Sequence, residues 1–231
     1  MSPVPSSAEP AAPAGPPGGG AFEAVVLAAS LGGLGVLRQA LGGLPPGFPA
    51  AMLIVQHRSP GRAGSGADSL AAVLDRHSTL PVGTAVEGDP LLPGRAAVVP
   101  PRTSLRLDGG GLIRLRPAGA RRMADPTLEA LSERFGPRLL VAVLTGLLDD
   151  GAAGARSVKA AGGRILVQDP ADAAAPAMPT AVLATGCVDL VVPASRLAAA
   201  LTALVMAPGG AGLLHVPTAA WARPAREGQG A

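Results

Sequence analysis

The sequence predicts an α/β fold, a doubly wound and mostly parallel sheet with helices on both faces and an antiparallel hairpin or edge near residues 95–117. Two patterns carry this prediction. Runs that are apolar throughout alternate with amphipathic stretches, which is typical of parallel strands buried on both faces of a sheet. The runs between residues 81 and 117 are shorter and are separated by Pro and by three consecutive Gly, which favours a hairpin there.

Five predicted pairs of a strand and a helix follow one another along the chain, because each short apolar run precedes a stretch with helical periodicity. In order, the pairs are 23–29 with 33–43, 50–56 with 66–77, 138–145 with 152–161, 164–168 with 178–185, and 187–192 with 194–205. Shorter runs at 95–99, 104–107 and 112–116 are the predicted strands of the middle section.

Residues 22–206 are the predicted domain. Residues 1–21 are of low complexity, rich in Pro, Ala and Gly, and we expect a disordered tail there; residues 207–231 read as a second, flexible tail. The N-terminus lacks a charged region of the kind that begins a signal peptide. No apolar stretch reaches the ~18 residues that a membrane-spanning helix needs. We therefore expect a soluble protein that does not insert into a membrane.

The composition narrows the function classes. Aromatic residues make up 2% of the chain and the net charge is only +3, so nucleic acid is not an expected partner. Arg114, Arg116, Arg121 and Arg122 form the densest basic cluster, which we interpret as a solvated face rather than a phosphate site. The single Cys187 excludes an internal disulfide and a zinc site built from several thiolates. A cytoplasmic location follows as the expectation.

One serine, Ser30, lies between the first predicted strand and the first predicted helix, with Gly32 and Gly33 directly after it. A tight turn of this kind exposes a nucleophilic hydroxyl and places backbone N–H groups where they can hold negative charge. Serine is also a preferred N-cap residue. Taken alone, the segment therefore leaves open whether Ser30 is a nucleophile or only a helix cap.

Two further polar groups follow strands of the same predicted sheet. His57 comes after the second strand, and Asp149 and Asp150 come after the strand predicted at 138–145. Ligands of open α/β sheets bind beyond the carboxyl ends of the strands. A serine, an imidazole and a carboxylate at one edge are the components of a triad, in which the imidazole takes the serine proton and the carboxylate orients the imidazole. Asp149 or Asp150 could instead cap the helix that follows.

Several motifs in order resemble the catalytic domain of the CheB-type chemotaxis protein-glutamate methylesterases. The resemblance covers residues 22–205. The motifs are AASLGG at 28–33, IVQH at 54–57, the stretch LDRHSTLPVGTAVEGDPLLPGRAAVVPP at 74–101, LTGLLDDGAAGA at 144–155, and the segments 162–170 and 177–193.

The resemblance implies Ser30 as the nucleophile, His57 as general base and acid, and Asp150 as the orienting carboxylate, with Asp149 serving at most as a cap. The implied reaction is hydrolysis of glutamate γ-methyl esters on the cytoplasmic helices of methyl-accepting chemoreceptors, and the same machinery would deamidate glutamine. It requires no metal and no organic cofactor. Backbone N–H groups near His57 and Leu147 would hold the oxyanion.

The resemblance also implies a substrate pocket, whose expected lining is Leu31, Arg58, Leu147 and Met178. Several residues depart from the family pattern. Leu31 replaces a threonine, Arg58 replaces a methionine, Ala28 and Leu148 replace glycines, and an expected histidine is absent from residues 100–107. Two alternatives therefore stay open: a non-catalytic module that binds a receptor or signalling partner, and an esterase with another ester substrate.

Many members of the family carry a phospho-receiver domain before the catalytic domain. Only about 21 residues precede the first strand here. We therefore expect an enzyme that is constitutively active or controlled by a partner. Separately, we expect a monomer.

Overall fold

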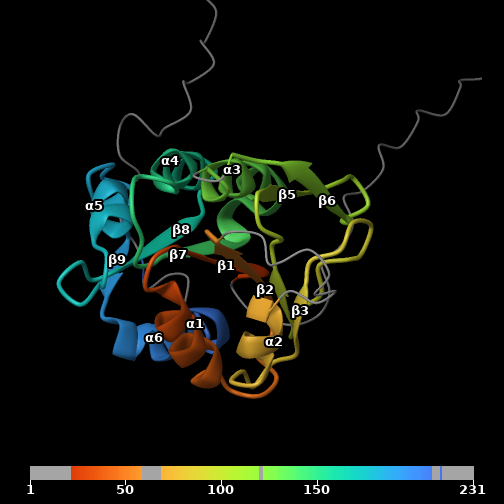
Figure 1. Cartoon of the computed structure of the whole chain (residues 1–231), viewed down its shortest axis with the longest axis horizontal. Coiled ribbons are helices and arrows are strands. Elements are labelled where there is room, and N and C mark those ends of the chain that lie inside the picture. The colour runs from red at the N-terminus through yellow and green to blue at the C-terminus, as the bar shows by residue number, and fades with distance from the viewer. Residues whose placement is uncertain (1–21, 59–68, 120–121, 210–213, 215–231) are drawn as a thin grey trace, which may run out of the picture.

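The structure, a computed structural model, describes residues 22–58, 69–119, 122–209 and 214 (Figure 1). Its centre is a seven-stranded sheet with the order β3-β4-β2-β1-β7-β8-β9, in which all neighbouring strands are parallel. The strands are β1 (Ala24–Ala29), β2 (Ala51–Gln56), β3 (Val82–Thr84), β4 (Ala96–Val98), β7 (Leu139–Val143), β8 (Arg164–Gln168) and β9 (Leu190–Val192).

Helices cover both faces of the sheet (Figure 1). One face packs against α1 (Gly33–Gly42), α2 (Ser69–Asp75) and α6 (Leu197–Met206), and the other packs against α3 (Ala124–Phe135), α4 (Ala152–Ala160) and α5 (Ala177–Leu183). Every residue of β1, β2 and β7 is buried, which explains why these strands are apolar throughout rather than alternating. Two short 3-10 helices, Gly136–Arg138 and Ala194–Arg196, complete the helical elements of the described residues.

The predicted α/β architecture is confirmed. The predicted hairpin is also present, as β5 (Thr103–Leu107) paired antiparallel with β6 (Ile113–Pro117). It forms a sheet of its own and lies over α3, whereas β4, predicted within the same section, pairs in parallel with β2 and β3. The antiparallel pairing is therefore confined to the hairpin.

Two elements were not predicted, β3 and α3. The α3 segment is polar on average and has a proline at its third position, a place where a helix tolerates proline because the N–H has no helical partner. Its buried residues Ala124, Leu128 and Leu131 nevertheless follow helical spacing. This helix matters for function, because its N-terminus faces the end of the sheet that carries the predicted site.

The arginine cluster has local partners. Arg114 forms ion pairs with Glu87 at 3.4 Å and with Asp108 at 2.7 Å, so carboxylates already neutralise its charge. Arg121 lies outside the described residues. So do residues 1–21 and most of 207–231, and the domain boundaries at these tails remain predictions. Leu214 is described, and it is buried against the core layer of α1 and α6.

Within the described ranges, no helix has both the length and the apolar character that a membrane span requires.

Candidate active site

Ser30 is the first residue after β1. Its N–H donates to the carbonyl oxygen of Thr145 at 2.9 Å, and its own carbonyl oxygen accepts from Gly33 N at 3.0 Å and from Gln56 Nε2 at 2.6 Å. The turn requires Gly32, which has a φ of +80° and is the N-cap residue of α1. No side chain caps this helix. The cap interpretation of Ser30 is therefore wrong.

The strand register brings His57 next to Ser30. Ala29 of β1 pairs with Gln56 of β2 as the last pair of the two strands, and Ser30 and His57 are the residues that follow this pair. The His57 N–H continues the ladder by donating to the Ala29 carbonyl oxygen at 3.0 Å. Adjacent strands lie roughly 4.8 Å apart, and paired residues project to the same face. Ala28 and Val55, two residues earlier, face α3 and α4, and the same alternation turns Ser30 and His57 toward that face.

The His57 ring is bonded to Asp150. Its Nε2 lies 2.6 Å from Asp150 Oδ2, and the histidine side chain is 11% exposed while the carboxylate is fully buried. An ionised carboxylate can only accept, so Nε2 carries the proton and Nδ1 is left as the basic nitrogen. The predicted pair of base and orienting carboxylate is thus in contact.

Asp150 is held by the N-terminus of α3. Its Oδ2 accepts from Met123 N and Ala124 N, each at 2.8 Å, and its Oδ1 accepts from Asp125 N at 2.9 Å. These N–H groups have no partners within the helix, and the helix dipole favours a negative charge there. Burial by itself would raise the pKa of Asp150, but the hydrogen bonds from the His57 ring and from Ala124 and Asp125 lower it below its ordinary value.

This lowered pKa gives a pH-dependent contribution to stability. Because the folded pKa lies below the unfolded value of about 3.9, the ionised carboxylate stabilises the fold above about pH 4, and the contribution disappears as pH falls through the folded pKa. We expect Asp150→Asn to lower the melting temperature at pH 7 and to differ progressively less from wild type as pH falls below about 4. Thermal denaturation of both proteins across this range is the measurement; a difference that grows on acidification would contradict the assignment.

The role of Asp125 was not predicted from the sequence. Like Asp150, it is a carboxylate that accepts backbone N–H groups at the start of a helix. From the first turn of α3 its Oδ1 accepts from Gly151 N and Gly154 N, each at 2.8 Å, at the start of α4. Asp150, which precedes α4, therefore caps α3, and Asp125 of α3 caps α4. Burial raises the pKa of Asp125, and the neighbouring charge of Asp150 raises it further against the hydrogen bond from Gly154. The signal in the sequence was an acidic residue in the first turn of a helix that had not been predicted.

Gly146 and Met178 support Ser30 from within the core. A Cβ on Gly146 would clash with the Met178 sulfur and would lie 2.7 Å from Ser30 Cβ, so this close approach requires glycine. Met178 is fully buried, and its N–H donates to the Gly146 carbonyl oxygen at 3.0 Å. The prediction that Met178 lines an open substrate pocket is therefore corrected: it is a core residue beneath the loop.

The other predicted pocket residues lie at the surface beside Ser30. Leu31 is 58% exposed and Leu147 is 52% exposed. Arg58 is half-buried and donates to the carbonyl oxygens of Gln56 at 3.1 Å and Val99 at 3.0 Å, so its guanidinium is anchored at the ends of β2 and β4. These contacts hold Arg58 beside His57.

The structure narrows the choice among the expected oxyanion donors near His57 and Leu147. The N–H of His57 is bonded to Ala29 within the ladder and cannot hold an oxyanion. The N–H groups of Leu31 and Leu147 make no hydrogen bond to any other described residue. They flank Ser30, one on its own turn and one on the loop after β7. Both groups are candidate donors to an oxyanion at Ser30.

Asp149 and Leu148 precede Asp150 on this loop. The Asp149 side chain is 63% exposed and faces Arg122 at 3.5 Å, so it neither caps α4 nor reaches His57. Leu148 has a φ of +67°, a left-handed conformation that costs a leucine roughly 1–2 kcal/mol. This is the position at which the family pattern has glycine.

We expect Leu148→Gly to raise the free energy of unfolding by about 0.5–1 kcal/mol, because relief of the left-handed strain exceeds the added entropy of the unfolded chain. Leu147→Gly is the matched control. Leu147 is equally exposed but has no positive φ, so its replacement should lower stability by about 0.5–1 kcal/mol. Urea denaturation compares the two, and equal losses in both variants would refute the strain at Leu148.

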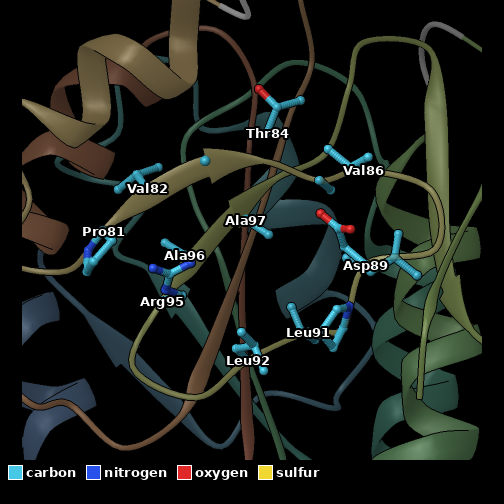
Figure 2. Close-up of a pocket in the computed structure, with 14 residues that line it drawn as sticks. Pro81, Val82, Thr84, Val86, Asp89, Leu91, Leu92, Arg95, Ala96 and Ala97 are labelled. Atoms are coloured by element: carbon cyan, nitrogen blue, oxygen red, sulfur yellow. The ribbon is translucent and has the colours of Figure 1, made fainter. Parts of the chain in front are cut away.

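A cavity of about 240 Å³ lies elsewhere, between β3, β4 and the loop 85–92 (Figure 2). Most of the residues that line it are apolar, and Asp89 and Arg95 are its charged residues. Neither Ser30, His57 nor Asp150 lines it. Among the described residues, no three His, Cys, Asp or Glu side chains lie together in a way that could hold a metal ion.

Fold and site together define an α/β domain in which a serine, a histidine and a buried carboxylate follow three neighbouring strands at one edge of the sheet. Comparison with known proteins identifies the family to which this domain belongs. The profile of the CheB methylesterase family matches residues 25–201. The chain belongs to the CheB methylesterase family.

Relatives and a solved structure agree with this membership. The chain is 36% identical over 196 residues to a protein-glutamate methylesterase/protein-glutamine glutaminase of Moorella thermoacetica, covering 81% of this chain and 45% of that protein. It is 39% identical over 186 residues to a protein of the same name, numbered 2, from Anaeromyxobacter dehalogenans, covering 79% and 53%. The crystal structure of the Thermotoga maritima CheB methylesterase catalytic domain superposes with a TM-score of 0.70 at 30% identity, covering 78% of this chain and 97% of that chain. The chain thus spans about half the length of these two curated relatives.

Proposed function

We propose that this chain is a protein-glutamate methylesterase that hydrolyses glutamate γ-methyl esters on chemoreceptors through Ser30, His57 and Asp150. The observation that carries the proposal is the bond between His57 Nε2 and the buried Asp150 carboxylate, directly beside Ser30 in the strand register. This bond fixes the tautomer that leaves Nδ1 basic. The names and functions of the relatives support the choice of ester.

The reaction follows from these positions. Ser30 Oγ attacks the ester carbonyl carbon while its proton passes to His57 Nδ1, and the carbonyl electron pair becomes an oxyanion. Collapse of this intermediate breaks the bond to methoxide, which takes the proton from His57 and leaves as methanol. A water then attacks the glutamyl ester of Ser30 with His57 as base, and its collapse returns the proton to Ser30 and releases glutamate. With glutamine as substrate, ammonia leaves in place of methanol.

Two features of the site assist the steps. The free N–H groups of Leu31 and Leu147 would donate to the oxyanion as it forms. The Ser30 hydroxyl makes no hydrogen bond to any described residue, so rotation of its side chain is free to bring Oγ to the base when substrate binds. Each proton in the proposed reaction passes through His57, and the backbone N–H groups only donate hydrogen bonds to the oxyanion.

The proposed substrates are cytoplasmic helices of methyl-accepting chemoreceptors, and a cytoplasmic location and a monomeric state are proposed with them. The test is methanol release when the full chain acts on a methyl-esterified chemoreceptor cytoplasmic fragment. We expect release from this fragment, with N-acetylglutamate γ-methyl ester as a slower small substrate. Binding of the fragment without methanol release would favour a non-catalytic module, and release from the small ester alone would favour an esterase with another substrate.

A further inference from the structure

Four exposed leucines lie on the turn that holds Ser30, the start of α1 and the loop that leads to Asp150. Leu31, Leu34, Leu147 and Leu148 are 58%, 41%, 52% and 48% exposed, and together they form what we call the leucine rim. Leucine is among the residues most often buried, and clustered exposed apolar side chains mark interaction sites. The rim residues lie within four positions of Ser30 or three of Asp150 in the sequence, so the rim belongs to the edge of the site.

The leucine rim has two halves on opposite sides of the sheet edge. Leu31 and Leu34 belong to the turn and first helical turn of α1, while Leu147 and Leu148 belong to the loop that leads into α4. The helices α1 and α4 cover opposite faces of the sheet (Figure 1). Thr145 joins the two segments, because its Oγ1 donates to the Leu31 carbonyl oxygen at 2.9 Å. The turn that holds Ser30 and the loop that leads to Asp150 are therefore in contact, and each side of this contact carries an apolar pair.

One rim residue is held at an energetic cost. Leu148 keeps its left-handed φ of +67° although glycine would occupy this backbone conformation without strain. Retained strain at an exposed side chain points to a function for that side chain, since packing in the core does not require it.

We propose that the leucine rim binds an amphipathic helix of the substrate protein in which apolar side chains lie one turn before and one turn after the esterified glutamate. This inference rests on the proposed function. A glutamyl ester that reaches Ser30 must enter between the two leucine pairs. On a helix the residues three and four positions away on either side share its face, so they meet the two halves of the rim. A short flexible ester would leave most of the rim uncovered.

The test uses two helical peptides, each with one glutamate γ-methyl ester. In one peptide the positions i−4, i−3, i+3 and i+4 are Leu, and in the other they are Gln, which has a similar helix propensity. We expect the full chain to release methanol from the Leu peptide with kcat/KM at least about tenfold higher than from the Gln peptide. Equal values for the two peptides would overturn the inference.

Variants of the rim residues test whether the leucine rim causes the preference for the Leu peptide. Leu34→Gln and Leu147→Gln should each reduce the ratio of kcat/KM for the Leu peptide to that for the Gln peptide. Leu92→Gln is the matched control, because Leu92 is 43% exposed but lies at the separate cavity (Figure 2), and it should keep the wild-type ratio. An unchanged ratio in both rim variants would exclude the leucine rim. If neither peptide nor N-acetylglutamate γ-methyl ester released methanol, the proposed function would also be wrong, whereas cleavage without preference would refute only the rim.

Discussion

Ser30→Ala is expected to reduce methanol release from a methyl-esterified chemoreceptor fragment by a factor of about 10⁴ or more, because the variant has no nucleophile to form the acyl intermediate. The assay is kcat from methanol appearance, compared with wild type at the same substrate concentration. Residual release within about tenfold of wild type would mean that another group attacks the ester.

The fold should survive this change. The Ser30 hydroxyl makes no hydrogen bond to a described residue, and the bonds that hold the turn come from its backbone. The melting temperature of Ser30→Ala should therefore stay within a few degrees of wild type. A loss of activity can then be assigned to the missing hydroxyl rather than to unfolding.

Asp150→Ala is expected to have the second-largest effect, and to act on activity and stability together. The carboxylate accepts three backbone N–H groups and the His57 ring, all at 2.6–2.9 Å. Removing it leaves buried donors without partners, for which we expect a loss of roughly 3–5 kcal/mol in the free energy of unfolding. It also frees the His57 tautomer, for which a further loss of about 10⁴ in kcat is expected.

Asp125→Ala separates the two effects. It likewise removes a buried carboxylate that accepts two backbone N–H groups, here from Gly151 and Gly154, but Asp125 does not contact His57. Stability should fall by a few kcal/mol, as in Asp150→Ala. The loss of kcat, measured at a temperature where both variants are folded, should be much smaller. Equal loss of kcat in the two variants would show that Asp150 acts only through the fold.

The sequence was sufficient to predict the parts of the site that depend on strand order. Ser30 and His57 each follow an apolar strand, and parallel pairing of those strands brings the two residues together at one edge. Asp150 follows β7, and its place was predicted for the same reason. The position of each residue along the chain therefore fixed its place at the sheet edge.

The parts that were missed depend on contacts between segments far apart in the chain. Asp125 acquires its role only because the N-termini of α3 and α4 lie against each other. The sequence pattern of neither segment predicts this contact. Met178 looked like a pocket residue by resemblance, but the close approach of Gly146 closes the core over it. The hydrogen bond that occupies the His57 N–H also depends on a distant segment, because its acceptor Ala29 lies on the neighbouring strand β1.

The central claim is that His57, oriented by Asp150, makes Ser30 a nucleophile. The most direct measurement is reaction of the full chain with a serine-directed phosphonate, followed by mass spectrometry of the modified peptide and by the rate of modification in His57→Ala. The account predicts one adduct, on Ser30, that forms at least about 10²-fold more slowly in His57→Ala. A folded protein that is not modified, or is modified on another serine, would contradict it.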